Sequence, residues 1–160
     1  MIHATAGAKL FIGGTIDLPS GDLSESDFDG ETWVEIKELE SLGTIGDQAE
    51  EVEFSAIGSA RTRRLKGTRS AAPMEVIAGI DYDDDGQLAL IAAEKTHHNY
   101  AFKIEFNDAP EGGTPSERMF AAIVGSASEQ LDTANSVMKL NAALWPNSNV
   151  VRIDAAPAGG

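Results

Sequence analysis

An acidic turn matches half of a calcium-binding loop. Residues 81–86 read Asp-Tyr-Asp-Asp-Asp-Gly, so Asp81, Asp83 and Asp85 alternate as the first carboxylates of an EF-hand loop do. The pattern then fails, because the twelfth position is Ala92 where that loop needs a bidentate Glu. The preceding residues also predict a strand and not a helix. We therefore interpret the segment as a strand end followed by a helix N-cap, with the three carboxylates as weak candidates for a metal site.

No other residue pattern indicates catalysis or a cofactor. The chain has no cysteine, which excludes thiol nucleophiles, disulfides and cysteine metal sites. His97 and His98 are adjacent, so in a strand they point to opposite faces and do not chelate one metal. The GxSxG nucleophile elbow, the Walker A loop and the GxGxxG fingerprint are all missing from the sequence. We expect neither enzymatic activity nor a cofactor.

Charge is distributed very unevenly along the chain. The net charge is −14, from 26 acidic and 12 basic residues, which disfavours binding to nucleic acid or to anionic membranes. Between Asp17 and Glu53 there are thirteen acidic residues and a single basic one, Lys37. Five of the basic residues then follow within nine positions: Arg61, Arg63, Arg64, Lys66 and Arg69. No apolar run approaches the roughly 20 residues of a membrane span.

Short alternating segments predict a mainly β protein. Apolar and polar residues alternate, or apolar residues run together, over 33–40, 50–56, 74–80, 99–106, 117–125, 134–144 and 149–154. In the second of these segments, the alternation predicts that Val52 and Phe54 face inward. A helix is predicted over 84–96, with Asp84 or Asp85 as its N-cap. The expected fold is an antiparallel β-sandwich or barrel with one flanking α-helix and long projecting loops.

The 160 residues predict a single domain. We expect residues 1–32 to form an N-terminal arm and an acidic loop, and residues 57–72 to form a projecting basic loop. Residues 155–160 are expected to be a flexible tail. The apolar stretch near the N-terminus is too short for a signal peptide, so the chain is expected to be cytosolic when it is made.

The basic segment has three interpretations. It could bind phosphates, but it has no aromatic residue for stacking on bases. It could be a solvated loop. As a projecting hairpin or arm it would reach roughly 20 Å from the body, and could bind the acidic region 17–53 of another copy. Such a head-to-tail contact closes into rings or propagates as filaments. On this last interpretation, the contact residues are Arg61, Arg63, Arg64, Leu65, Lys66 and Arg69.

The order of these features resembles the major tail tube proteins of long, non-contractile-tailed bacteriophages and of gene transfer agents. The resemblance rests on the alternating segment 33–40, the Gly-rich loop 41–46, the segment Glu-Glu-Val-Glu-Phe at 50–54, the basic arm 61–67 and the helix start at 83–90. It is strongest between residues 33 and 125. It implies a β-sandwich with one flanking helix, assembled as hexameric rings that stack into a tube.

The resemblance also implies partners and a location. A tape measure protein would fill the lumen, and tail terminator and distal tail proteins would bind the ends of the tube. DNA would pass through an acidic lumen without specific binding, in agreement with the net charge of −14. The protein would lie in the virion tail after assembly in the host cytoplasm. Residues 57–72 would contact the neighbouring ring, and the acidic loop 17–31, longer than expected for the family, would order only between rings.

Two alternatives stay open. One is a calcium-dependent β-sandwich binding module that uses Asp81, Asp83 and Asp85. The other is a different tube component of similar fold, such as a tail terminator or the tube of a secretion system.

Overall fold

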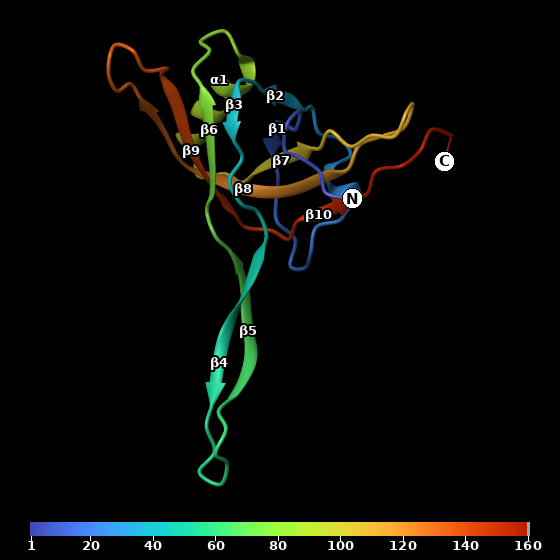
Figure 1. Cartoon of the computed structure of the whole chain (residues 1–160), viewed down its shortest axis with the longest axis vertical. Coiled ribbons are helices and arrows are strands. Elements are labelled where there is room, and N and C mark those ends of the chain that lie inside the picture. Colours follow the sequence, from blue (N-terminus) through green and yellow to red (C-terminus); the bar gives the residue numbers. More distant parts are fainter. Residues whose placement is uncertain (160) are drawn as a thin grey trace.

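A computed structural model describes residues 1–159 (Figure 1). It is mainly β, with one α-helix in the described residues, as the sequence predicted. The strands are β1 (Lys9–Thr15), β2 (Val34–Ile36), β3 (Leu39–Ser41), β4 (Asp47–Phe54), β5 (Arg63–Ala71), β6 (Met74–Gly79), β7 (Tyr100–Glu105), β8 (Glu117–Gln130), β9 (Lys139–Pro146) and β10 (Val151–Ile153). The α-helix is α1 (Asp85–Glu94), and a 3-10 turn covers Glu25–Phe28. Among residues 1–159, no helix is long and apolar enough to cross a membrane.

Eight strands form one antiparallel sheet that curls around the core. The order is β2-β1-β7-β8-β9-β6-β3, and β10 also pairs with β8. β2 and β3 lie at opposite ends of this order, yet only Lys37 and Glu38 separate them in the chain. The sheet must therefore bend until its ends approach each other. The concave face buries the main apolar cluster, in which the rings of Phe102 and Phe120 stack with centroids 5.7 Å apart.

Helix α1 fixes the turn at which the sheet ends meet. Asp84, its N-cap, accepts hydrogen bonds through Oδ2 from the backbone N–H of Gln87 (3.1 Å) and of Lys37 (3.0 Å). The Gln87 amide Nε2 donates to the carbonyl oxygens of Lys37 (3.0 Å) and Gly79 (2.8 Å). Both side chains are buried. Because buried polar groups must be paired, these bonds hold the β2–β3 turn, the helix and β6 together.

A second apolar cluster covers the outer side of β7 and β8. Leu23 and Phe28 are buried there against Ala101 and Met119. Asn149 holds this segment, because its Oδ1 accepts from the N–H of Leu23 (2.7 Å) and its Nδ2 donates to the carbonyl of the same residue (3.0 Å). The segment expected to order only between rings is thus packed on its own chain.

Several element boundaries differ from the predictions. Residues 9–15, expected within an arm, form strand β1 between β2 and β7, because alternating Leu10 and Ile12 enter the core. The predicted strand 33–40 breaks in two at Glu38, whose φ is +61°. The strand expected over 134–144 begins only at Lys139. Flexibility of 155–160 stays a prediction: Ala156 forms an isolated bridge with Thr114, and Gly160 lies outside the described residues.

Candidate assembly interface

Strands β4 and β5 form a hairpin that projects far from the body of the molecule (Figure 1). We call residues 47–71 the finger. The two strands pair only with each other and form their own two-stranded sheet. Near the tip, the hydroxyls of Ser55 and Thr62 lie 2.9 Å apart and tie the strand ends together. The basic segment thus lies on a projecting hairpin, one of the arrangements expected from its length.

One face of the finger is charged and largely pairs with itself. Glu51 lies opposite Lys66 and Glu53 lies opposite Arg64, so these four side chains share a face. The Arg64 Nε lies 2.7 Å from Glu51 Oε1 and 3.8 Å from Glu53 Oε1. At the root, Arg69 Nη2 lies 3.4 Å from Asp47 Oδ2. These pairs are mostly exposed, so each adds at most about 1 kcal/mol of stability.

These ion pairs bear on the interpretation that the basic segment binds the acidic region 17–53 of another copy. Two of the five cations, Arg64 and Arg69, pair with acids of their own chain. The acids that satisfy them belong to the same 17–53 region that was expected to bind another copy. Arg61, Arg63 and Lys66 form no ion pair within residues 1–159.

The opposite face of the finger is apolar and uncovered. Val52 lies opposite Leu65, and Phe54 lies opposite Arg63. The exposed fractions are 46 % for Val52, 57 % for Phe54 and 63 % for Leu65. The prediction that Val52 and Phe54 point inward is therefore wrong: they share a face, but no part of the described chain packs on it. A contiguous exposed apolar face of this kind is typical of an interaction surface.

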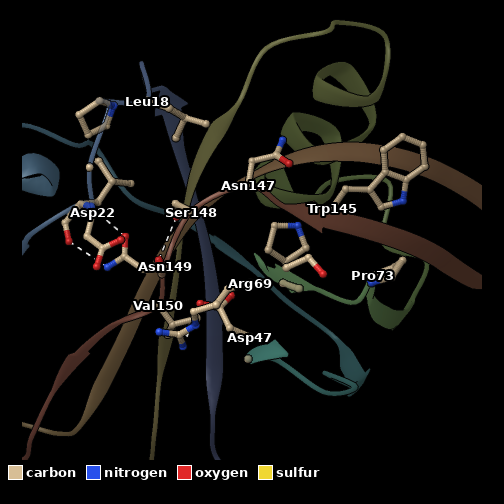
Figure 2. Close-up of a pocket in the computed structure, with 17 residues that line it drawn as sticks. Leu18, Asp22, Asp47, Arg69, Pro73, Trp145, Asn147, Ser148, Asn149 and Val150 are labelled. Carbon is tan, nitrogen blue, oxygen red and sulfur yellow. Dashed lines mark hydrogen bonds and ion pairs between the residues drawn. The ribbon is translucent and has the colours of Figure 1, made fainter. Parts of the chain in front are cut away.

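A hollow of about 840 Å³ lies between the root of the finger and the body (Figure 2). Leu18 and Trp145 lie on its two sides, with Asp47 and Arg69 where the finger joins the body. The indole of Trp145 lies directly against Gly125. A Cβ at position 125 would overlap this ring, so the close contact requires glycine. The lining of the hollow combines apolar side chains such as Leu18 with polar ones such as Ser148 and Asn149.

The acidic turn does not form a metal site in the described structure. Within residues 1–159, no three His, Asp or Glu side chains are placed to hold a metal ion. Asp81, Asp83 and Asp85 therefore do not form such a group. Asp81 Oδ1 instead accepts from the backbone N–H of Asp83 (3.0 Å). Asp84 caps the helix, as predicted.

A second carboxylate has a clear structural role on the body. Asp108 accepts from the Ser116 hydroxyl (2.6 Å) and from the Ser116 backbone N–H (2.8 Å). These two hydrogen bonds lower the pKa of Asp108 from its ordinary value. Ser116 Oγ also accepts from the N–H of Ala155, so this group ties the loop after β7 to the C-terminal segment.

Known structures share this fold. No family model matches the chain, and no curated protein sequence matches it. The fold is similar to a chain of the anti-feeding prophage baseplate, with a TM-score of 0.68 and 12 % identity over 96 % of this chain and 97 % of the other. A chain of the PVC sheath/tube terminator, from an extracellular contractile injection system, gives 0.66 and 11 %, over 96 % and 97 % of the two chains. The SPP1 tail tube gives 0.60 and 16 %, over 94 % and 77 %. The chain therefore has the fold of tail tube and related injection-system proteins.

Proposed function

We propose that this protein is a structural subunit of a tail tube, which assembles as stacked hexameric rings and has no catalytic role. The observation that carries the proposal is the finger. It extends far from the body, and no part of residues 1–159 covers its apolar face of Val52, Phe54 and Leu65. Burying such a face is favourable, and a second copy supplies the cover. Arg61, Arg63, Arg64, Leu65, Lys66 and Arg69 stay the proposed contact residues.

The main sheet offers a way to close a ring. Beyond Ala122, β8 pairs with β9 but no longer with β7, and β3 is an end strand of the sheet. The section β8–β9–β6–β3 thus has a free edge on each side. Free edges pair readily with strands of other chains. Lateral pairing of six copies would make one continuous sheet around a lumen.

The face of this section that points away from the core suits a lumen. It carries small and polar side chains, among them Ser126, Ser128 and Asn141. Lys139, at one end, pairs with Glu40 at 2.9 Å. Such a wall has few free cations to hold phosphates, and the net charge of −14 adds repulsion. We propose that DNA passes along this face without specific binding, after a tape measure protein has occupied the lumen.

The proposed setting is the virion tail of a siphophage or a gene transfer agent, with assembly in the host cytoplasm. Terminator and distal tail proteins are the proposed partners at the ends of the tube. A second candidate function is a terminator or baseplate ring. It is favoured by the similarity to the anti-feeding prophage baseplate and PVC terminator chains, which extends over nearly the full length of both. The two functions differ in whether rings stack indefinitely.

Electron microscopy of the purified protein tests the proposal. Long tubes support the tail tube, single rings support the terminator, and monomers at all concentrations overturn both. The double variant Arg63→Glu with Arg64→Glu is expected to fold and to form no tubes. Normal tubes from this variant would show that the finger is not the contact. Its matched control is Arg152→Glu, an equally exposed arginine on the body.

A further inference from the structure

The end of the molecule opposite the finger carries a second exposed apolar patch. In Figure 1, the turn before α1 and the loop between β8 and β9 lie at the far end of the long axis from the finger tip. Tyr82 in that turn is 68 % exposed, and Val137 in that loop is 69 % exposed. They line one open hollow of about 390 Å³ together with Glu38, Ile80, Asp81 and Asp83, which we call the distal groove.

We infer that the distal groove of one copy receives the apolar face of the finger of another copy. The inference rests on the proposed function, since it assumes that copies meet through the finger, and it adds the surface on which the finger docks. Both surfaces carry exposed apolar side chains: Phe54 and Leu65 on the finger, Tyr82 and Val137 in the groove. In the single chain these apolar side chains are exposed to water, and contact between the two surfaces would bury both, which is favourable.

The charges around the two surfaces are complementary. Beside the apolar face, Arg61 and Arg63 have no ion pair in the described chain. Around the distal groove, Glu38, Asp81 and Asp83 have none either. Opposite charges around an apolar centre fix orientation and raise the rate of association. This arrangement also gives the acidic turn 81–85 a role that is neither catalytic nor metal-binding.

The hollow at the root of the finger is a weaker match. The space at the root of the finger holds Asp47 and Arg69, which already pair with each other. It therefore offers little free charge to an incoming cation. Glu51 and Glu53 are likewise engaged by Arg64, and Glu50 accepts a hydrogen bond from the Thr68 hydroxyl. The distal groove adds Asp81 and Asp83 to the proposed acceptors, and Glu38 is its one member from the region 17–53.

The positions of the two surfaces suit a repeating assembly. Because they lie at opposite ends of the long axis, copies that all point the same way can each offer a finger to one neighbour and a distal groove to the next. The contact is heterologous and repeats from copy to copy along one direction. That is the contact a stack of rings requires between its layers.

A charge exchange tests the docking surface. Arg63→Glu and Asp83→Arg each reverse one exposed charge, so the fold, checked by circular dichroism, is expected to persist. Each variant alone is expected to raise the critical concentration for tube assembly by about tenfold or more, measured by sedimentation. The chain that carries both changes is expected to return to within about threefold of the wild type. Arg64→Glu with Asp83→Arg is the control, since Arg64 lies on the other face and should give no rescue.

The outcomes separate the two proposals. Normal assembly of Asp83→Arg, with assembly blocked in Arg63→Glu, overturns the distal groove and leaves the tail tube standing. Two impaired single variants without rescue in the double variant also overturn it, because the residues then act in different contacts. Val137→Ser serves as a second groove variant that changes no charge, and it too is expected to impair assembly. A wild-type chain that never assembles overturns the proposed function itself.

Discussion

Truncating Phe54 isolates the contribution of the apolar face from that of the charges. Phe54 lies on β4 opposite Arg63, and 57 % of its surface is exposed in the single chain. Phe54→Ala removes the ring but leaves the backbone pairing and every ion pair of the finger in place. Any loss of assembly therefore reports apolar contact between copies, whichever surface of the second copy receives the ring.

The size of the effect follows from the exposed area. Complete burial of a large apolar side chain contributes about 1.5–3 kcal/mol, so covering the exposed half of Phe54 contributes about 1–1.5 kcal/mol per contact. A change of about 1.4 kcal/mol corresponds to a factor of ten in an equilibrium constant. We expect the critical concentration for assembly to rise about tenfold. The free energy of unfolding of the subunit should change by less than about 0.5 kcal/mol, because the side chain is not in the core.

Two measurements on the same preparation check this prediction. Sedimentation gives the critical concentration, and urea unfolding of the subunit gives its stability. Glu53→Ala is the matched control, since it shortens the neighbouring side chain on the charged face of the same strand. Unchanged assembly in Phe54→Ala, with tubes at the wild-type concentration, would refute the assignment of this face to a contact. An equal rise of the critical concentration in Phe54→Ala and Glu53→Ala would show that assembly is sensitive to any truncation on the finger and not to its apolar face in particular.

Three further changes probe the body of the molecule. Asp84→Ala should lower the free energy of unfolding by about 2–4 kcal/mol, measured in urea, because two buried backbone N–H groups lose their acceptor. Gly86→Ala should cost about 1–3 kcal/mol in the same assay, since the added Cβ would overlap the backbone at Glu35. Ser116→Ala should raise the pKa of Asp108 toward its ordinary value, followed by NMR of the carboxyl carbon. Because the pKa of Asp108 is lower in the folded state, its carboxylate stabilises the fold at pH values above the ordinary pKa of an aspartate. This stabilisation is lost as the pH falls through the lowered pKa, so the stability of the Ser116→Ala variant should depend less on pH in that acidic range.

Each of these changes has a result that contradicts it. Wild-type stability in Asp84→Ala would mean that the helix does not hold the β2–β3 turn, and Asp83→Ala, which removes an exposed neighbour, is the control. An unperturbed Gly86→Ala would place the helix farther from β2 than the structure does. An unchanged titration of Asp108 in the serine variant would assign its lowered pKa to groups other than the Ser116 hydroxyl.

The predictions from sequence succeeded where a pattern had a local cause. The alternation over 99–106 predicted a strand, and β7 forms there with Phe102 and Ile104 in the main core and Tyr100 and Phe106 packed against it. An aspartate N-cap, Asp84 or Asp85, was predicted from residue type, since an aspartate before a run of helix formers accepts the first free N–H groups, and the structure has Asp84. The Asp84 bond to Lys37 could not be predicted, because it joins residues 47 positions apart. The break at Glu38 has the same origin: the sheet must turn there so that its ends can meet.

The finger shows most clearly what alternation does and does not determine. A period of two assigns Val52 and Phe54 to one face and Glu51 and Glu53 to the other, and the register of the hairpin agrees with both assignments. It carries no information on what covers either face. The charge pattern predicted that the basic residues pair with acids, but it does not determine whether those acids belong to the same chain. Arg64 pairs with Glu51 on its own hairpin. Two-stranded hairpins are only marginally stable alone in water. For this finger, burial of the apolar face against a second copy would supply stability that its exposed ion pairs do not, so we expect the proposed assembly also to order the finger.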